Sequence, residues 1–461
     1  MIVAGAPPKR FRSPILIWAA LIVLLSVLGG CSNQPGRKRA VTLTLVERGW
    51  FNKEFREVRD RQYTQFTAQT GIQVKLLPGP ESAAEQLRLW ENLLGLRPEP
   101  ITVHPDVFGI DVIWPGIFAD YLLDLKPYVA EDLPLYFPQL VANMTLNGKL
   151  VAVPNKLDLG LLYYRTDLLE KYGYRSPPDT WSELEQMAAR IQAGERAAGK
   201  KDFWGYVWEG ADNETLTSNA LEWQASEGGG HIIDGKQVSV NNANAIHSWE
   251  RAAGWVGTIS PRGVTSYKEQ DAMNIWLAGD AAFMRNWTAS RIVSASPISA
   301  VRDRFGVTLV PRGQAGRAEV FGGDGYAVSK QSAHPQEAIA LVRFLCSRPQ
   351  QALVATALSM APTIPDLFDD ASVVKANPHF AGMRQLVATA MVSRPSSVAG
   401  TRYPTVSQAY TSAVHSVLIH ERSGTAAAAD LQKQIAAILN EKGTSDDASA
   451  GQAASTKNGA R

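Results

Sequence analysis

Acidic and aromatic side chains stand where apolar runs of this sequence end, and their types suggest a binding chemistry. Asp111 and Trp114 lie at the end of the apolar run 107–113, Asp158 lies in a polar loop between two apolar runs, and Trp287 ends another run. Ligands of open α/β sheets gather at the carboxyl ends of strands. Neutral sugars offer hydroxyls and apolar C–H faces, which carboxylates and aromatic rings recognise. The competing interpretations are core packing for each tryptophan and a turn or helix cap for each aspartate.

The sequence lacks the residue patterns of common hydrolases and nucleotide-binding enzymes. It contains no His-Glu-x-x-His, no Gly-x-Ser-x-Gly and no clustered Cys/His metal set. Residues 230–236 match most of a phosphate-binding loop, but Gln237 replaces the Ser or Thr that would hold magnesium. Asp234-Gly235 predicts a tight hairpin there instead. A glycosidase carboxylate pair stays open as an alternative, because a sequence does not show the separation of two carboxylates.

Local patterns predict strands alternating with helices. Residues 41–45 alternate like a strand, an apolar stripe over 55–66 predicts a helix, and 72–76 predicts a second strand. Strand, helix and strand in this order favour a right-handed parallel unit. Two capping boxes predict helix starts, at Ser82–Glu85 and at Thr180–Glu183. The chain is therefore expected to be an α/β protein.

The N-terminal segment has the features of an export signal. Three basic residues precede the apolar run 15–28, which is shorter than an ordinary membrane-spanning helix. Leu28-Gly-Gly-Cys31 resembles the bacterial lipobox, in which the cysteine becomes the lipidated N-terminus; a plain membrane anchor with a chance cysteine is the alternative. We predict a lipoprotein signal peptide at 1–30, lipidation of Cys31, a tether over 31–40 and an exported, membrane-anchored protein.

Length and charge limit the class of protein. The 461-residue chain has a formal net charge of +2, and removal of residues 1–30, with three basic and no acidic residues, leaves a charge of −1. A near-neutral exported protein has no electrostatic reason to bind nucleic acid. The remaining 431 residues are too many for one ordinary core, so two domains are expected. Cys346 lies in an apolar helical pattern and is predicted to be a buried thiol. Residues 441–461 predict a disordered tail.

Five stretches are most informative by their order along the chain. They are Gly148–Lys171, Pro177–Trp181, Gly228–His231, Gly279–Trp287 and Gly322–Val328. Their order and spacing resemble those of bacterial extracellular solute-binding proteins (family 1) that serve carbohydrate ABC importers. The chain is most similar to the trehalose/maltose-binding lipoprotein branch of that family, on the stretches Asp111–Gly116, Gly254–Pro261 and Ser393–Pro395.

The resemblance implies a two-lobe periplasmic-binding-protein-like fold of type II. Each lobe is then a discontinuous doubly wound α/β sheet with flanking helices. The first lobe is expected to comprise 41–158 and 283–325, and the second lobe 159–282 and 326–440. Crossings between the lobes are expected near Asp158, near Phe283 and again after Val320.

Carried over position by position, the resemblance also implies a set of substrate-binding residues. Acidic members accept sugar hydroxyls, an arginine donates as a fork, tryptophans supply stacking faces, and two glycines let backbone amides approach the ligand. The set is Glu47, Gln86, Asp111, Trp114, Asp158, Trp255, Glu269, Trp287, Gly322, Gly323 and Arg394, with Trp208 as a further stacking face. No catalytic residue, metal or cofactor is implied.

The expected function is capture of a disaccharide or small oligosaccharide, trehalose-like or maltose-like, by a monomer that delivers it to the permease subunits of an ABC importer. The alternatives are an exported carbohydrate-active enzyme, such as a lyase or glycosidase, and a binding protein for a polyamine or another small polar solute. Two pairs depart from the family pattern, Asp212-Asn213 and Asn155-Lys156. Both lie near the expected cleft, so they bear on which sugar is bound.

Overall fold

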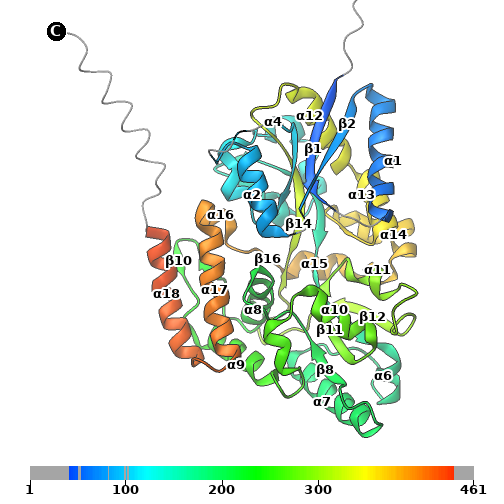
Figure 1. Ribbon diagram of the computed structural model, residues 1–461, viewed down its shortest axis with the longest axis vertical. Coiled ribbons are helices and arrows are strands. Elements are labelled where there is room, and N and C mark those ends of the chain that lie inside the picture. Colours follow the sequence, from blue (N-terminus) through cyan, green and yellow to red (C-terminus); the bar gives the residue numbers. More distant parts are fainter. Residues whose placement is uncertain (1–40, 50–52, 81, 98–99, 101–102, 441–461) are drawn as a thin grey trace, which may run out of the picture. The chain divides into compact units, whose positions relative to one another are not determined.

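The computed structural model describes residues 41–49, 53–80, 82–97, 100 and 103–440. Within these ranges two sheets form the cores of two lobes (Figure 1). The first lobe contains a six-stranded sheet of β15 (Ala361–Pro362), β6 (Val153–Asp158), β14 (Gly322–Val328), β3 (Val107–Asp111), β1 (Thr42–Arg48) and β2 (Gln73–Gly79), in this spatial order. The second lobe contains a four-stranded sheet of β12 (Phe305–Leu309), β7 (Gly160–Arg165), β11 (Ala281–Trp287) and β8 (Trp204–Val207). The predictions for Cys31, the signal peptide, the tether and the tail fall outside the described residues.

The first sheet begins with the predicted strand–helix–strand unit. β1 and β2 are parallel and are joined through α1 (Lys53–Thr70), which confirms the local prediction. β3 lies parallel to β1 on its other side. β14 then runs antiparallel between β3 and β6. β1 is a buried strand because Leu43, Leu45 and Val46 are fully enclosed.

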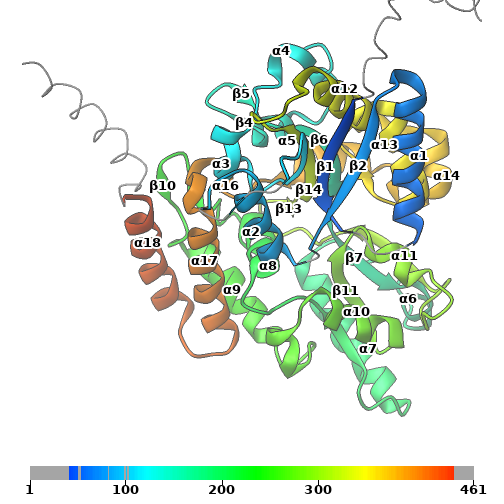
Figure 2. The same cartoon turned by 45° about the horizontal axis from the view of Figure 1, so that its top comes forward.

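Helices cover both faces of the first sheet, with α1 and α2 (Ala83–Leu93) on opposite sides (Figure 2). Arg59 of α1 bonds to Glu47 on one face. Trp90 of α2 packs edge-on against Phe108, which is in register with Val46 and therefore points to the other face. Two further helices, α12 (Pro335–Cys346) and α13 (Arg348–Leu358), also pack on this lobe, α12 against β14 and β6 and α13 against α1.

The second sheet is mixed, because β7 is antiparallel to both β11 and β12 while β8 is parallel to β11. Its surrounding helices are α6 (Thr166–Lys171), α7 (Trp181–Ala197), α8 (Glu214–Ser226), α9 (Ala243–Trp255), α10 (Glu269–Ala278) and α11 (Ser290–Ser294). The predicted capping box at the start of α7 is formed, since Thr180 and Glu183 exchange side-chain and backbone bonds.

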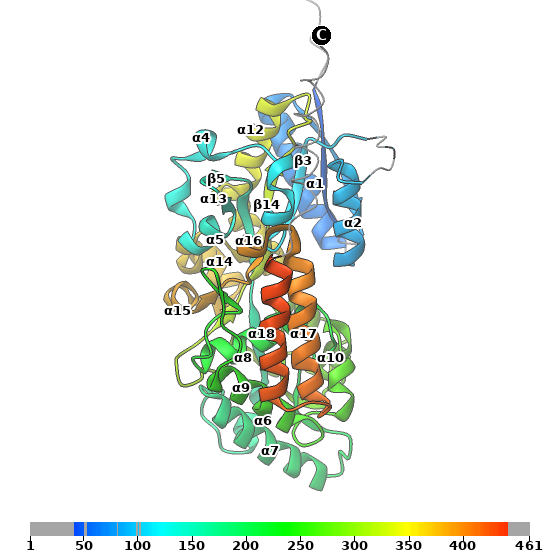
Figure 3. The same cartoon turned by 90° about the vertical axis from the view of Figure 1, so that its left-hand side faces the viewer.

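A C-terminal helical pair completes the second lobe. α17 (Tyr403–Leu418) and α18 (Gly424–Asn440) lie side by side, and both pack against α9, while α17 also packs against α8 (Figure 3). The short elements around them are β9 (Ile233–Asp234), β10 (Gln237–Val238), β13 (Glu319–Val320), β16 (Met391–Val392) and α16 (Ser396–Ala399). The remaining elements of the first-lobe segments are α3 (Pro115–Phe118), α4 (Lys126–Val129), α5 (Pro138–Asn143), β4 (Thr145–Leu146), β5 (Lys149–Leu150), α14 (Ala371–Ala376) and α15 (Met383–Ala390).

The chain passes between the two sheets near two of the predicted places, Asp158 and Val320, and departs from the prediction elsewhere. The first passage is at Asp158–Gly160, between β6 and β7, as expected. The predicted return near Phe283 is wrong, because Phe283 pairs with Tyr164 inside the second sheet. The chain returns only between β12 and β14, so 283–309 belongs to the second lobe. It leaves the first lobe again between β16 and α17, so much of the segment predicted for the second lobe, including α12 and α13, lies in the first.

Two local predictions can also be checked. Ser82 precedes α2, but its side chain makes no capping bond, so the predicted capping box is not formed there. The hairpin predicted at Asp234-Gly235 does form, since Asp234 pairs with Gln237 and Gly235, with a φ of 59°, lies in the turn between β9 and β10. This turn excludes a phosphate-binding loop at residues 230–236, because they belong to a hairpin and not to a strand-to-helix loop. Among the helices of the described ranges, none combines the length and apolar composition needed to cross a membrane.

Candidate ligand-binding site

The aspartates that end β3 and β6 lie at the same edge of the first sheet. Asp111 is in register with Asp324 of β14, and Asp158 is in register with Gly322. Because β14 runs between β3 and β6, the two aspartates are two strands apart and two residues out of step. A strand spacing of about 4.8 Å and a rise of about 3.3 Å per residue then put their Cα atoms about 12 Å apart. A short glycine-containing stretch of β14 separates the two carboxylates.

Each of these aspartates holds one carboxylate oxygen against the protein backbone. Oδ1 of Asp111 accepts the N–H of Ile113 at 3.1 Å, and Oδ1 of Asp158 accepts the N–H of Thr288 at 3.0 Å. Burial raises the pKa of both carboxyls, and a nearby cation opposes that shift in each case. Both residues remain partly exposed. They are thus pre-positioned acceptors that a ligand hydroxyl can reach.

The two glycines between the aspartates differ in what they tolerate. Gly323 has a φ of 114°, and a Cβ built on it would lie 2.2 Å from the carbonyl oxygen of Lys156. Gly322 has ordinary backbone geometry, and its added Cβ would meet only Trp287 at 3.4 Å and Asp158 at 3.5 Å. The backbone conformation at position 323 therefore requires glycine. At Gly322 the lack of a side chain leaves space beside the indole of Trp287.

Trp287 places the end of a second-sheet strand beside this edge of the first sheet. It is the last residue of β11 and is half-buried, and its ring edge lies beside Gly322 of the first sheet. The guanidinium carbon of Arg285 lies 4.2 Å from the ring centroid. The backbone carbonyl of Trp287 accepts the hydroxyl of Tyr163 at 2.7 Å. Asp158, Gly322 and Trp287, which were predicted from separate stretches of sequence, are thus brought together.

Arg394 lies in the same region, but its guanidinium donates its hydrogen bonds to other groups of the protein. Its Nη1 donates to Glu214 at 2.7 Å, and its Nη2 donates to the backbone carbonyl of Phe321 at 3.2 Å. Burial alone would lower the pKa of this guanidinium, but the neighbouring Tyr403, Glu214 and Asp111 raise it above its usual value. Arg394 therefore fixes the residue that precedes Gly322, and its charge faces Asp111.

Glu47, predicted to accept sugar hydroxyls, is occupied inside the first lobe. Its two oxygens accept bonds from Nε and Nη2 of Arg59, each at 2.9 Å, and from the hydroxyls of Tyr63 at 3.1 Å and Tyr326 at 2.6 Å. The residue is 4% exposed. All of its ordinary acceptor directions are used, so the structure does not support a ligand-binding role for Glu47.

The other predicted stacking tryptophans are packed in lobe interiors. Trp114 is 2% exposed and packs against Trp90 and Phe118. Trp255 and Trp208 belong to an aromatic cluster of the second lobe and donate their indole N–H groups to Glu185 and Ser260 respectively. Core packing, the competing interpretation, accounts for these rings.

Gln86 and Glu269 are related less directly to the candidate site. Gln86 is buried on α2, one turn before Trp90. Glu269 begins α10, accepts the hydroxyl of Thr215, and its backbone carbonyl accepts the amide of Asn286 at 3.1 Å. Because Asn286 directly precedes the site tryptophan, Glu269 supports the end of β11 from the second lobe.

Sequence reasoning treated Asn155 and Lys156 only as a departure from the family pattern and assigned them no contact. Nζ of Lys156 lies 2.6 Å from Oδ2 of Asp324, and Nδ2 of Asn155 donates to Oδ1 of the same aspartate at 3.2 Å. Arg285 and its carboxylate partner Glu222 were also missed. For Arg285 the available signal was a charged residue inside the largely apolar run 281–287.

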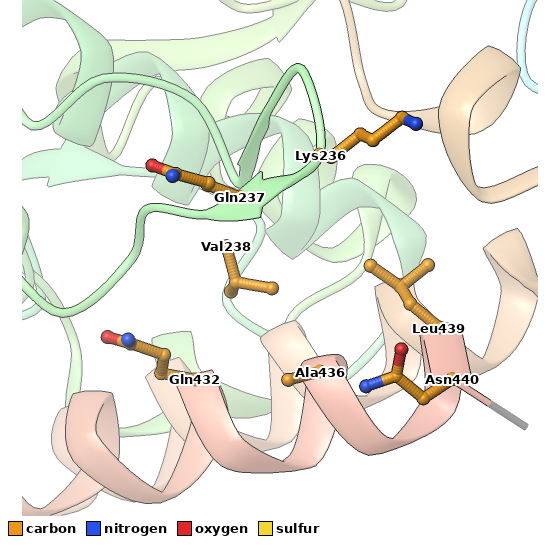
Figure 4. Close-up of a pocket in the computed structure, with 7 residues that line it drawn as sticks. All are labelled: Lys236, Gln237, Val238, Gln432, Ala436, Leu439 and Asn440. Carbon is orange, nitrogen blue, oxygen red and sulfur yellow. The ribbon is translucent and has the colours of Figure 1, made fainter.

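Two cavities lie elsewhere in the described part of the chain. One of about 290 Å³ lies between the β9–β10 hairpin and α18 and is lined by Lys236, Val238 and Leu439 among others (Figure 4). Another of about 580 Å³ is lined by residues of α7 and α9, with Trp255 in its wall. Apart from Trp255, neither cavity is lined by a predicted binding residue. Across the described ranges no group of three or more His, Cys, Asp or Glu is suited to hold a metal ion.

Residues 62–382 match the family model described as bacterial extracellular solute-binding protein. The chain belongs to this family. A probable ABC transporter-binding protein of Deinococcus radiodurans is 42% identical over 372 residues, which cover 80% of this chain and 87% of that relative. The maltodextrin-binding protein MdxE of Bacillus subtilis is 23% identical over 323 residues, which cover 67% and 70% of the two chains.

Solved structures show the same fold. The maltose-bound MalE3 of T. maritima is 33% identical, with a TM-score of 0.75 over 86% of this chain and 99% of that chain. The GacH receptor of Streptomyces glaucescens has a TM-score of 0.72 at 23% identity, over 88% and 100% of the two chains, and supports the fold alone. The predicted fold class is confirmed. These relatives and structural neighbours are solute-binding proteins, and the chain is accordingly a binding protein rather than an enzyme.

Proposed function

We propose that this solute-binding protein captures a disaccharide or small oligosaccharide, trehalose-like or maltose-like, and delivers it to the permease of an ABC importer. The observation on which this rests is the pair of partly exposed aspartates that flank the glycines of β14, with Trp287 beside them. Two aspartates whose Cα atoms lie about 12 Å apart suit a ligand longer than one pyranose ring. The maltose bound by the 33%-identical MalE3 supports the same chemical class.

The proposed contacts divide between the two lobes. Asp111 and Asp158 accept hydroxyls from the first sheet, and the indole of Trp287 stacks on a sugar ring from the second sheet. A ligand that touches both sheets favours the arrangement in which both sets of contacts form. The connection at Asp158–Gly160 is short, so closure about it changes the separation of these groups with few backbone rotations. Glu269 and Arg394 hold the ends of β11 and β14 in this scheme.

The proposed location is outside the cytoplasm, on a lipid anchor at Cys31. The family is described as extracellular, and the lipobox-like sequence before Cys31 supplies the modification site. One measurement tests the anchor directly. Mass spectrometry of the protein purified from a bacterial membrane is expected to show a chain that begins at acylated Cys31. An intact Met1 N-terminus would contradict this.

The binding proposal is tested by calorimetric titration of the protein that begins after Cys31. Trehalose, maltose, sucrose and glucose are each titrated, and each mixture is checked afterwards for breakdown. Saturable binding of an intact disaccharide, strongly weakened in Trp287→Ala, is the expected result. The matched control is Trp204→Ala, because Trp204 is a half-buried tryptophan of the same sheet that also has an arginine over its ring. Absence of binding by every sugar, or hydrolysed sugar in the cell, would refute the proposal.

A further inference from the structure

The indole of Trp287 is backed by a buried charge cluster. Arg285 precedes it by two residues on β11, so the two side chains project from the same side of the strand. The guanidinium lies over the ring at 4.2 Å from the centroid and is 1% exposed. A cation this close to an indole face is attracted to it, most strongly where water is excluded. One face of the ring is therefore covered from inside the second lobe.

Carboxylates of other elements fix the guanidinium in place. Nη2 of Arg285 donates to Oε1 of Glu222 at 2.7 Å, and Nε donates to Oε2 at 3.3 Å, a fork that sets the plane of the group. Glu209 lies on the other side at 3.6 Å. Both glutamates are fully buried. Burial alone would lower the pKa of Arg285, but these two carboxylates raise it above its usual value.

The crossover segment has a glycine, Gly160, at the point where the Arg285–Glu222 ion pair lies. Gly160 is in register with Trp287. A Cβ built on Gly160 would lie 2.1 Å from Nη2 of Arg285 and 2.3 Å from Oε1 of Glu222. Its φ does not require glycine, since Gly160 is absent from the residues with positive φ. The space that the missing side chain leaves is therefore taken by the ion pair that backs the indole.

Other groups hold Trp287 through its backbone and border one edge of its ring. Its N–H donates to the side-chain oxygen of Asn286 at 2.9 Å, and its carbonyl accepts the Tyr163 hydroxyl. The ring edge lies beside Gly322, which has no side chain to press against it. Arg285, which lies over the ring face, is thus placed to restrain the tilt of the ring plane.

We propose that Arg285 is a positioning residue, anchored by Glu222, that holds the indole of Trp287 as a flat platform for a ligand ring. This rests on the proposed function, in which Trp287 stacks on the sugar. The competing explanation is a buried ion pair that stabilises the second lobe and has no effect on the ligand. A second arginine–tryptophan pair allows a comparison, because Arg196 lies 4.4 Å from the ring centroid of Trp204, a residue of the same sheet. Trp204 is opposite Ala281, about 20 Å along β11 from Trp287.

The first test is a thermodynamic cycle on maltose affinity. Arg285→Lys keeps a positive charge for Glu222 but loses the planar fork. We expect it to weaken maltose binding about fivefold to tenfold in the otherwise unchanged protein. In a Trp287→Ala background the same change is expected to have less than about a twofold effect. Arg196→Lys is the matched control and is expected to leave the affinity unchanged. An equal loss with and without Trp287 would overturn the proposal.

A second readout does not depend on the ligand. In protein labelled with 5-fluorotryptophan, the fluorine resonance of Trp287 is assigned with Trp287→Phe. Arg285→Lys is expected to shift or broaden that resonance, and Arg196→Lys is expected to leave it in place. If Arg285→Lys does not fold, the charge-neutral pair Arg285→Met and Glu222→Gln replaces it, since it leaves neither partner of the fork as an uncompensated charge.

The outcomes separate the two proposals. A resonance of Trp287 that is unmoved by either Arg285 variant would overturn the positioning role. A resonance that moves while no sugar binds would support the positioning of the ring and refute sugar capture. A moved resonance together with the affinity loss that depends on Trp287 supports both.

Discussion

At the scale of single residues, the site depends on carboxylates that are partly desolvated but not paired with a cation at bonding distance. Asp158 illustrates the balance. Burial raises its pKa, while the charge of Lys156 and the bonds from Thr288 oppose the shift. A carboxylate in such surroundings gains more from each donated hydroxyl than an exposed one, because less water competes for it. Discrimination among neutral ligands then depends on where these few oxygens point.

We expect Asp158→Asn to weaken disaccharide binding by roughly tenfold to a hundredfold, the range for one charge-assisted hydrogen bond. The asparagine oxygen can still accept the N–H of Thr288, so the local backbone is kept and mainly the charge is lost. Calorimetric titration gives the change in dissociation constant. The control is Asp202→Asn, an exposed residue of the second lobe. Unchanged affinity in Asp158→Asn would remove this residue from the site.

A second prediction concerns the buried carboxylate Glu209. Burial raises its pKa to about 7, despite the opposing charge of Arg285 and a bond from Asn219. Between an ordinary glutamate pKa of about 4.5 and this value, the folded protein holds a proton that the unfolded chain has released. Stability therefore falls as pH rises through that interval and levels off above it. We expect Glu209→Gln to raise the free energy of unfolding by roughly 1 to 3 kcal/mol at pH 8 and to change it little at pH 4.5.

Denaturant unfolding at both pH values measures this, with Glu195 as a control of opposite sign. Although burial disfavours its ionised form, the bonds from Lys171, Lys200 and Tyr172 hold the pKa of Glu195 down at about 2. Glu195 therefore contributes stability above pH 4.5 that is lost as pH falls toward 2. Glu195→Gln should destabilise the fold at pH 8. A Glu209→Gln variant that is likewise destabilised at pH 8 would contradict the raised pKa.

At the scale of elements, β14 is the strand on which the site is built. It lies between β3 and β6, and its first residues separate the two aspartates. The register shifts between Asp324 and Gly325, where the strand is irregular. Such irregularities re-aim a strand near functional sites. If β14 were a regular strand of ordinary residues, side chains would fill the space that Gly322 and Gly323 leave free at this edge of the sheet.

The two glycines of β14 give a matched pair of variants. Gly323→Ala is expected to lower the free energy of unfolding by about 2 kcal/mol or more, because it combines a φ of 114° with a clash against the carbonyl of Lys156. Gly322→Ala is expected to fold with stability within about 0.5 kcal/mol, since its Cβ meets ordinary van der Waals distances. Thermal and denaturant unfolding compare the two. Equal stability of both variants would show that the strained geometry at Gly323 is wrong.

Elements that depend on neighbouring residues were predictable from the sequence, and those that depend on distant pairing were not. β1, α1 and β2 follow from local periodicity and adjacency in the chain. The assignment of β11 failed because strand pairing with β7 joins residues far apart in sequence. For the site, Asp158 and Trp287 were found because each ends an apolar run. Glu47 and Trp114 satisfy the same rule but are enclosed by partners that only the folded chain supplies. Arg285 was missed for the complementary reason, since its anchor, Glu222, lies on helix α8, far away in the sequence.

At the scale of the whole molecule, the chain passes three times between the two sheets. The connections are Asp158–Gly160, the segment from β12 to β14, and the segment from β16 to α17. Bonds between the lobes also occur away from the site, where Arg291 of α11 donates to Ser359 at 3.2 Å. Three connections between the same two lobes permit rotation of one lobe on the other while keeping the strand ends near each other. A ligand then acts on an equilibrium between arrangements through the contacts it gains with both lobes.

The last prediction follows from that equilibrium. Spin labels on cysteines introduced at the exposed Lys75 of the first lobe and Lys201 of the second report the distance between the lobes. The native Cys346 does not interfere, because it is fully buried and burial raises the pKa of its thiol. A saturating disaccharide is expected to shorten and narrow the distance distribution, and a ligand that stacks on Trp287 alone is not. The Trp287→Ala variant with the same labels is expected to keep the ligand-free distribution at the same sugar concentration. If the sugar binds and the distribution does not change, the ligand sits on one lobe, and the division of its contacts between Asp158 and Trp287 is wrong.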